Sequence, residues 1–451
     1  MINTYGWIAI GILSLLLAVQ GIITLYLMLY TWMRPERLEE ARSPKNFAAP
    51  MLKFTALLPA RHEQAVIAHT IDRVCSTSYP KDLIEVVVIC EASDTETIAE
   101  AVRAAGKISS TDVQVVTFDD GPINKPHGLN VGLHASTFEI VTIFDAEDDV
   151  HPEIFDVVNT IMLDEDAGIV QAGVQLMDFR SSWYAPHNVL EYFFWFKSRL
   201  HFHARVGSVP LGGNTVFMKR SLIDEAGGWD ENCLTEDADI GMRMSALGER
   251  IAITYDHEHA TREETPPSIG NFIRQRTRWN QGFLQVVRNG DWRHLETRNQ
   301  RLLAAYTLLY PIVQAALAIL WLPALITALT LKAPIIIALL SLSPFYFLAF
   351  KYIVDLVGLS EFCRSYGFRI TPKDVMVFTL GFLPYQMLLN LSALRAVVRH
   401  IQGTSNWEKT AHTGAHRAAS DRFTPQREPA LLRARAEIIS GRDVISEVAD
   451  D

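Results

Sequence analysis

Four long apolar runs constrain the fold of this chain more than any other feature of its sequence. An uncharged apolar helix of about 20 residues can cross roughly 30 Å of hydrocarbon. Runs of this kind cover residues 7–32, 302–331, 333–350 and 375–394. We expect at least three of them to span a bilayer, because the buried helices of a soluble protein do not need apolar runs of this length.

The runs divide the chain into four expected regions. These are an N-terminal transmembrane anchor (1–33), a cytosolic domain (34–301), a C-terminal transmembrane region (302–397) and a cytosolic or flexible tail (398–451). The first run lacks the basic start and cleavage site of a signal peptide, so we expect it to remain as an anchor.

Basic residues near the apolar runs predict the orientation of the chain. Arg34, Arg37 and Arg42 follow the first run and no Lys or Arg precedes it, so the positive-inside tendency places the large domain in the cytosol. If all three C-terminal runs cross, the tail lies outside, although Arg395 and Arg399 favour the cytosolic side. In the alternative topology one run is re-entrant or interfacial.

Composition excludes two classes of protein. The chain carries 41 Lys and Arg against 51 Asp and Glu, a net charge of −10. Nucleic-acid binding rewards clustered basic charge, so we expect no nucleic-acid partner. The cysteines have no CxxC or zinc-finger spacing, and we interpret them as reduced thiols. They are Cys75, Cys90, Cys233 and Cys363.

Strand and helix patterns alternate in the hydrophilic domain. We predict strands at residues 54–60 (FTALLPA), 84–90 (IEVVVIC), 113–118 (VQVVTF) and 139–144 (EIVTIF), and helices at 65–75 and 96–106. This rhythm predicts an α/β domain with a mostly parallel sheet and helices on both faces. Ligands of such sheets bind at the carboxyl ends of the strands.

Carboxylates follow two of these strands. Glu91 and Asp94 come after the second strand, and a dense acidic stretch follows the fourth. It contains Asp145, Glu147, Asp148 and Asp149. Carboxylates at a strand end suit a hard divalent cation, Mg²⁺ or Mn²⁺, and a nucleotide diphosphate shared with it. The alternative is a local turn that caps a helix beginning at Pro152.

Further motifs follow in a fixed order. They are KPHGLN (125–130), PLGGNTVFMKR (210–220), LTEDADIGMRM (234–244) and RQRTRWNQGF (274–283). Together with the acidic stretch they resemble the membrane-embedded synthases of glycosyltransferase family 2, which include bacterial cellulose, hyaluronan and chitooligosaccharide synthases. The resemblance covers roughly residues 54–282, and NWEKTAHTG (406–414) is similar to a tail of bacterial members.

The resemblance implies a Rossmann-like GT-A fold joined to an α-helical transmembrane bundle, in a multi-pass protein of a bacterial-type inner (plasma) membrane. It also implies inverting transfer of a sugar from a UDP-sugar. By position, Asp145 and Glu147 are the expected metal ligands, with Glu147 standing where the family usually has a second Asp. Asp237 is the expected catalytic base, with Glu236 beside it.

The expected roles agree with the chemistry of the residue types. A sugar hydroxyl is a poor nucleophile near neutral pH and needs a base in reach, and the leaving diphosphate needs positive charge. The residues expected to bind the nucleotide sugar are Pro59, Glu91, Asp94, Lys125, Asp145 and Arg278. Those expected to bind the acceptor are Gln275, Arg278, Trp279 and Gly213.

Some of these residues have a structural alternative. Thr235 could act as the N-cap of a helix that begins at the TED motif. Trp279 could anchor an amphipathic helix at the membrane interface. Residues 191–206 (EYFFWFKSRLHFHARV) read as another interfacial helix, and its His201 and His203 lack the further ligands of a zinc site.

Three functions remain open at this point. The chain could extend a β-linked polysaccharide and export it, and the overall motif set favours this hypothesis. It could instead transfer one sugar to a lipid acceptor, as the related ceramide glucosyltransferases do. The third hypothesis is a catalytically silent sugar-binding or transport protein, supported only by Glu147 in place of Asp. The expected partners are a UDP-sugar, a polysaccharide or lipid-linked acceptor, and the bilayer.

Overall fold

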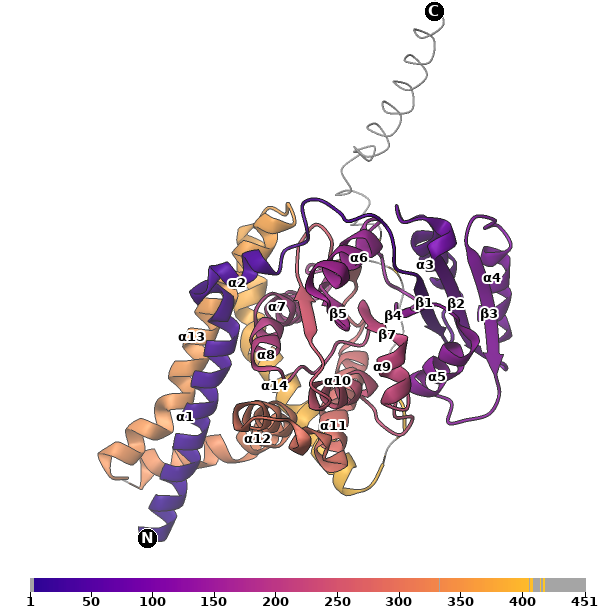
Figure 1. The fold of residues 1–451 in the computed structure, drawn as a ribbon. Coiled ribbons are helices and arrows are strands. Elements are labelled where there is room, and N and C mark those ends of the chain that lie inside the picture. Colours follow the sequence, from indigo (N-terminus) through magenta and orange to yellow (C-terminus); the bar gives the residue numbers. More distant parts are fainter. Residues whose placement is uncertain (1–3, 332, 405, 409–413, 415–416, 418–451) are drawn as a thin grey trace, which may run out of the picture.

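The computed structural model describes residues 4–331, 333–404, 406–408, 414 and 417. A seven-stranded sheet with the order β3-β2-β1-β4-β7-β5-β8 forms the centre of the hydrophilic domain (Figure 1). Its strands are β1 (Phe54–Ala60), β2 (Ile84–Glu91), β3 (Asp112–Phe118), β4 (Ile140–Ile143), β5 (Ile169–Ala172), β7 (Val216–Lys219) and β8 (Ile251–Thr254). A second sheet pairs β6 (Val174–Leu176) with β9 (Thr261–Glu263). The four predicted strands are confirmed to within one residue at each end.

The direction of the strands decides which loops meet. β1 is parallel to β2 and β4, and β2 is parallel to β3, as predicted. β7 runs antiparallel to both of its neighbours, β4 and β5. Its first residue Val216 pairs with Ile143 at the end of β4, so the chain just before β7 lies at the same sheet edge as the carboxyl ends of β1 to β4.

Helices cover both faces of the sheet. One face packs against α3 (Ile67–Cys75), α4 (Thr95–Ala105) and α6 (Ile154–Glu165). The other packs against α5 (Lys125–Ala135), α9 (Arg220–Glu225) and α10 (Glu236–Ala246). Side chains of β1 alternate between the two cores, because successive residues of a strand point to opposite faces. The predicted helices at 65–75 and 96–106 are therefore confirmed as α3 and α4.

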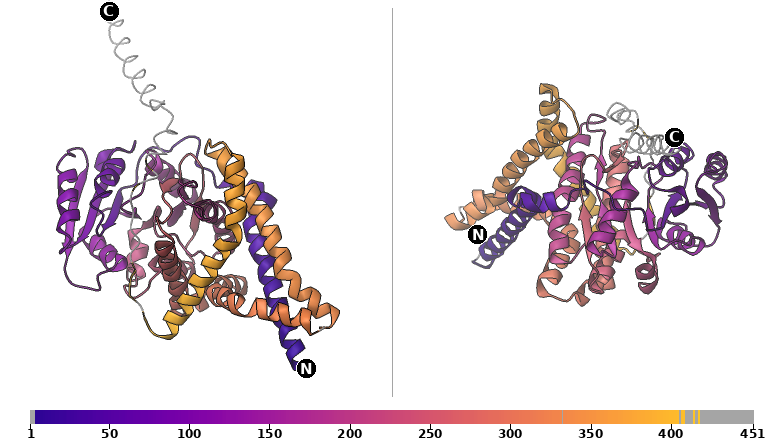
Figure 2. Two further views of the ribbon diagram at one scale, coloured as in Figure 1. Left: turned by 180° about the vertical axis from the view of Figure 1, so that it is seen from behind. Right: turned by 45° about the horizontal axis from the view of Figure 1, so that its top comes forward.

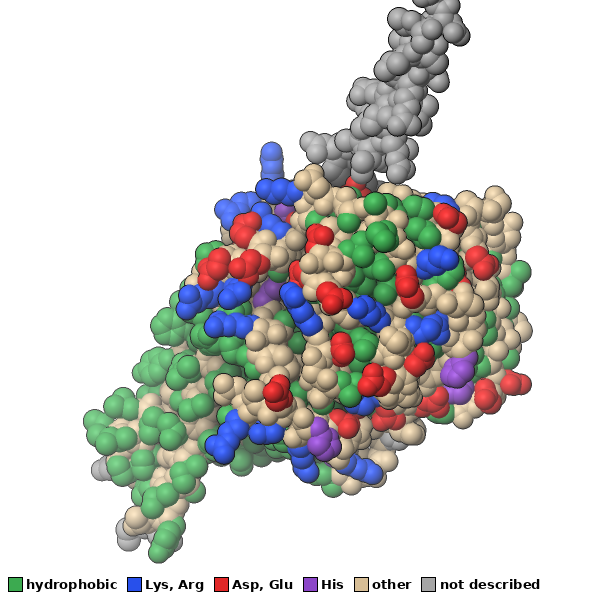
Figure 3. All heavy atoms as spheres, viewed as in Figure 1, with side chains coloured by type: hydrophobic (Ala, Val, Ile, Leu, Met, Phe, Trp, Pro, Cys, Tyr) green, Lys and Arg blue, Asp and Glu red, His purple; other side chains and the backbone are tan. Residues whose placement is uncertain are grey.

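Within the described residues, four helices are long and apolar enough to cross a membrane. They are α1 (Thr4–Met33), α12 (Arg298–Thr330), α13 (Ile335–Ser365) and α14 (Pro372–Ile401). α1 and α13 lie side by side and protrude from the domain, while α12 runs across them (Figures 1 and 2). On the face shown in Figure 3, hydrophobic side chains cover the protruding part and charged side chains gather elsewhere. These features indicate association with a membrane.

Shorter helical segments lie within the domain and between it and the long helices. They are α2 (Pro35–Glu40), α7 (Ala185–Phe194), a π-helical turn (Trp195–Arg199), α8 (Leu200–Val206), α11 (Ile269–Asn289) and two 3₁₀ turns (Lys81–Leu83 and Asp291–His294). The helical structure expected for residues 191–206 is confirmed. Its side chains Phe193, Phe194 and Leu200 are buried in the protein core, and the segment contacts α1 and α13. A position at the membrane interface stays a prediction for this segment.

Candidate active site

A pocket of about 210 Å³ lies where the carboxyl ends of β1 and β2 meet the loop after β4 and the loop before β7. The first turns of α5 and α10, one face of α11 and the segment after α14 complete its wall. The predicted site residues that line it are Pro59, Glu91, Lys125, Asp145, Glu147, Gly213, Glu236, Asp237, Gln275, Arg278 and Trp279. The structure thus gathers every predicted site residue except Asp94.

Asp94 has a different environment from the one expected. Its buried carboxylate caps α4 by accepting the Thr97 backbone N–H, and it also accepts the backbone N–H of His62. Burial raises the pKa of Asp94, but these hydrogen bonds outweigh burial and lower it. Of the two carboxylates expected near the nucleotide, only Glu91 reaches the pocket, where Arg61 Nε lies 2.8 Å from Glu91 Oε2.

The first two carboxylates of the acidic stretch face the pocket. Lys125 Nζ donates to Asp145 Oδ1 at 2.6 Å, so an ammonium group occupies a cation position beside this carboxylate. Glu147 is 6% exposed and lines the same wall. Asp145, which already attracts a cation, and Glu147 on the same pocket wall are a fitting donor set for Mg²⁺ or Mn²⁺.

The other two carboxylates of the stretch hold the loop in place. Asn214 Nδ2 donates to both carboxylate oxygens of Asp148, at 2.9 and 2.8 Å. Asp149 Oδ1 forms an ion pair with Arg73 Nε at 2.5 Å. The N-cap of α6 is Glu153, whose side chain makes no capping hydrogen bond. The acidic stretch therefore does not cap this helix, which removes the alternative considered for it.

Lys125 connects the acidic loop to the start of α10. As the first residue of α5 it also donates to the Gly213 carbonyl oxygen at 2.9 Å, and its Nζ lies 3.9 Å from Glu236 Oε1. Burial acts to lower the pKa of Lys125, but the carboxylates of Asp145 and Glu236 outweigh it and raise the pKa. The ammonium therefore stays charged between two groups of carboxylates.

Glu236 and Asp237 open α10 as a buried carboxylate pair. Burial raises the pKa of Glu236 to about 7, with Lys125 acting in the opposite direction. Burial also raises the pKa of Asp237, although the Ala238 backbone N–H, which donates to Oδ1 at 2.7 Å, partly offsets it. The alternative role of Thr235 is weakened, because it stands at the N-cap but makes no side-chain capping hydrogen bond.

Gly213 is close to this pair because it has no side chain. A Cβ built on Gly213 would lie 3.1 Å from Asp237 Oδ2 and 3.5 Å from Lys125 Nζ. Such a Cβ would press on the Asp237 carboxylate. Gly213 is expected to bind the acceptor. In the structure, its missing side chain lets the Asp237 carboxylate and the Lys125 ammonium approach its backbone.

One face of α11 supplies three polar or aromatic groups to the pocket. Arg278 and Trp279 follow Gln275 by three and four residues, so each of them lies on the same side of the helix as Gln275. Gln275 Oε1 and Arg278 Nε are buried and have no hydrogen-bond partner among the described residues. The Arg276 guanidinium lies 4.4 Å from the Trp279 ring centroid. Buried groups without partners on a pocket wall are suited to bind a polar ligand.

Trp407 is a pocket residue that the sequence analysis did not select. It follows α14, and its ring centroid lies 4.5 Å from the guanidinium carbon of Arg278. Glu408 beside it pairs with Arg395 at 2.6 Å and with Arg399 at 3.3 Å, which fastens the segment to α14. The available signal was the motif at residues 406–414, of which only 406–408 and 414 are described. Of the tail expected at 398–451, residues 398–401 are the last residues of α14, and residues 418–451 lie outside the described residues.

Comparison with known proteins agrees with this geometry. A family model described as "Glycosyltransferase like family 2" matches residues 50–282. The chain is 27% identical to the probable glycosyltransferase YdaM of Bacillus subtilis, over 52% of this chain and 56% of that protein. It is 25% identical to a beta-monoglucosyldiacylglycerol synthase of Nostoc sp., over 80% of this chain and 77% of that protein. It is 24% identical to a poly-beta-1,6-N-acetyl-D-glucosamine synthase of Staphylococcus epidermidis, over 56% of this chain and 59% of that protein.

A solved structure shares the fold. The mannosyltransferase PcManGT from Pyrobaculum calidifontis, in complex with GDP-Man and Mn²⁺, superposes with a TM-score of 0.54 at 16% identity. The match covers 87% of this chain and 99% of that one. With a family match over more than half of its length and a GT-A-like sheet, this chain belongs to glycosyltransferase-like family 2 and is a glycosyltransferase.

Proposed function

We propose that this glycosyltransferase transfers a sugar from a UDP-sugar to an acceptor hydroxyl with inversion, using Asp237 as the base. The observation that carries the proposal is the position of Lys125. Its ammonium contacts Asp145, one of the expected metal ligands, and also lies near Glu236, beside the expected base. The donor diphosphate and the attacking hydroxyl therefore have complementary groups within one pocket.

The carboxylate pair supplies the base. In the proposed step, the oxygen of the acceptor hydroxyl attacks the anomeric carbon while Asp237 accepts the proton of that hydroxyl. The bond from that carbon to the diphosphate oxygen breaks, and UDP leaves. Burial raises the pKa of Asp237, which makes its carboxylate a stronger base than a solvated one.

Positive charge in the same pocket would stabilise the charge of the leaving group. A divalent cation held by Asp145 and Glu147 would supply Lewis-acid stabilisation of the diphosphate. Lys125 adds a compact positive charge, and Arg278 offers a planar fork with an unpartnered Nε for phosphate oxygens. Trp279 presents an aromatic face for the acceptor sugar or lipid headgroup on the α11 side of the pocket.

A lipid acceptor is the first candidate. The match to the Nostoc glycolipid synthase covers 80% of this chain and therefore reaches beyond the glycosyltransferase domain. The match to the polysaccharide synthase of Staphylococcus epidermidis covers 56% of this chain. A growing polysaccharide, the acceptor favoured by the motif set alone, is therefore the second candidate. It is supported by the similarity to the Staphylococcus epidermidis synthase.

Product analysis tests both candidates. Purified full-length protein in lipid nanodiscs containing diacylglycerol is supplied with UDP-glucose, UDP-galactose, UDP-N-acetylglucosamine or UDP-glucuronate, plus Mg²⁺ or Mn²⁺. We expect UDP release with one donor and a monoglycosylated lipid as product. A long saccharide made without lipid would identify the polymer synthase instead. Donor binding without UDP release under any of these conditions would refute transfer and support a silent binding protein.

A further inference from the structure

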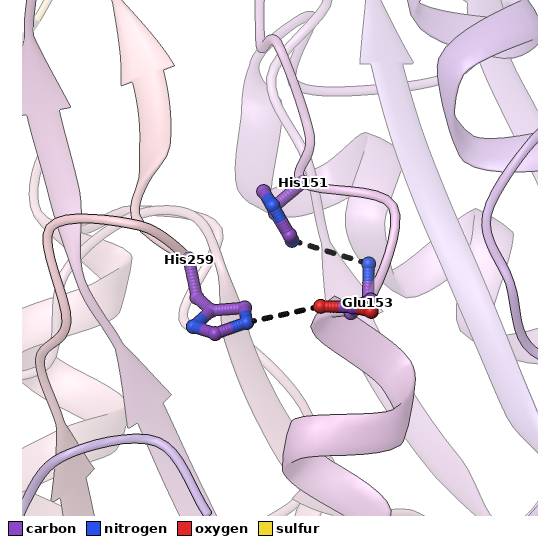
Figure 4. A group of neighbouring side chains, drawn as sticks. All are labelled: His151, Glu153 and His259. Atoms are coloured by element: carbon purple, nitrogen blue, oxygen red, sulfur yellow. Dashed lines mark hydrogen bonds and ion pairs between the residues drawn. The ribbon is translucent and has the colours of Figure 1, made fainter. Parts of the chain in front are cut away.

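A second group of potential metal ligands lies outside the active-site pocket. His151 and Glu153 come from the loop between β4 and α6, and His259 comes from the segment between β8 and β9 (Figure 4). One ligand atom from each side chain lies within 4.8 Å of the other two. The two imidazole rings meet edge to face, with centroids 4.6 Å apart.

We propose that His151, Glu153 and His259 bind a divalent transition metal such as Zn²⁺. Zinc takes imidazole nitrogens and carboxylate oxygens at about 2.0 Å, so two ligands on a tetrahedral ion are about 3.3 Å apart. His259 Nε2 and Glu153 Oε2 are already 3.3 Å apart. The fourth position of the ion would be taken by water.

The protonation states of the ligands suit a cation. Burial lowers the pKa of His151 to about 3, with a further lowering by His259 opposed by Glu153. Its ring is therefore neutral near pH 7, the form that binds metal. A hydrogen bond from His259 lowers the pKa of Glu153, so this side chain is a carboxylate. Glu153 is 31% exposed and His259 is 14% exposed, so an ion can enter from solvent.

Positive charge near the group limits its affinity for a cation. Arg73 and Arg262 both act to lower the pKa of His151, which shows that they lie close enough to repel a bound ion. Asp149 neutralises Arg73 through the ion pair described above. The carboxylate of Glu153 remains as the negative ligand. We therefore expect weaker binding than that of a zinc site built from thiolates.

The metal would fasten two segments that build the wall of the active site. The backbone N–H of Asp149 donates to the Arg262 carbonyl oxygen at 3.0 Å, and the Arg262 N–H donates to the Asp149 carbonyl oxygen at 3.1 Å. In each of the two segments, this bridged residue stands between a residue of the pocket and a residue of the proposed zinc site. Glu147 and Glu263 on the pocket side belong to the same segments as His151 and His259 on the metal side. Binding would stabilise this wall whether or not sugar transfer takes place, so the inference does not rest on the proposed function.

Zinc binding and thermal stability test the proposal. Purified full-length protein is stripped with chelator, dialysed and titrated with ZnCl₂ by calorimetry, while Tm is followed and bound zinc is counted by mass spectrometry. Cobalt absorption reports imidazole ligation. We expect this group to bind one zinc per chain and Tm to rise when it does. His259→Gln should weaken zinc binding on the order of 100-fold or more by removing one ligand.

Two further variants make the result specific. His257→Gln changes an exposed histidine two residues away that is outside the group, and it should bind zinc like the parent. Asp145→Ala disables the expected active-site metal ligand, and it should keep the zinc response. Zinc affinity and Tm response in His259→Gln equal to those of the parent would overturn the proposal, as would a parent chain that binds no zinc.

Discussion

Replacing Asp237 with asparagine tests the proposed base directly. Asparagine has the shape of aspartate but does not accept a proton at neutral pH. Its Oδ1 can keep the hydrogen bond that the Ala238 N–H donates to Asp237 Oδ1 at 2.7 Å. Lys125 keeps its 2.6 Å contact with Asp145, so the groups expected to bind the donor diphosphate stay in place. We therefore expect a folded protein that binds the donor.

The size of the expected effect follows from the role of the residue. A positioned general base contributes about 10²- to 10⁴-fold to a rate. This factor corresponds to roughly 3–5 kcal/mol in the activation barrier, because each tenfold change is about 1.4 kcal/mol. We expect turnover to fall by at least about 10²-fold.

The assay measures UDP release and donor affinity in one preparation. Retained affinity with at least a 10²-fold lower turnover number supports Asp237 as the base. Glu236→Gln in the adjacent position is the matched comparison, and we expect a smaller loss because it acts on the local charge alone. If Asp237→Asn kept turnover within tenfold of the parent while binding donor normally, another group would have to accept the proton.

Three further predictions concern the metal, the pH dependence and the acceptor. Asp145→Ala should abolish UDP release, and chelation should do so reversibly in the parent. Glu147→Asp should retain activity. Full turnover in strong chelator would contradict a metal requirement. Activity should fall as pH drops, because burial raises the pKa of Glu236 to about 7 and raises that of Asp237, so acid protonates the base. Glu236→Gln removes a negative neighbour and should move this acid limb of the pH–rate profile to lower pH; an unmoved limb would mean that the pair is not coupled. Trp279→Ala should impair transfer to acceptor far more than donor affinity or slow donor hydrolysis. Loss of all three activities together with loss of folded protein would instead identify Trp279 as an anchor.

The local pattern of the sequence predicted the parts of the fold that depend on neighbouring residues. The mostly apolar residues of 54–60 and 84–90 predicted β1 and β2 almost to the residue, because strands buried on both faces need such runs. The long apolar runs likewise predicted α1, α12, α13 and α14. Strand-end motifs and the family resemblance together predicted twelve site residues, and eleven of them line one pocket. The strand-end residues meet there because a parallel sheet gathers its carboxyl ends at one edge.

The sequence did not contain a local signal for the direction of β7. Its three apolar residues and Lys219 are compatible with either strand direction. Only pairing with β4 and β5 decides that Gly213 and Asn214 meet the acidic loop. The different positions of Glu91 and Asp94, both expected near the nucleotide, have a similar cause. Both follow β2, but the start of α4 takes Asp94 as its cap and leaves Glu91 for the pocket.

Contacts between distant segments were decided by the tertiary structure alone. Trp407 reaches Arg278, and His259 reaches Glu153, across more than a hundred residues of chain. Periodicity and capping act over a few residues, so the sequence can be read for them directly. A contact between remote side chains depends on how whole helices and strands pack, and no short pattern in either segment encodes it.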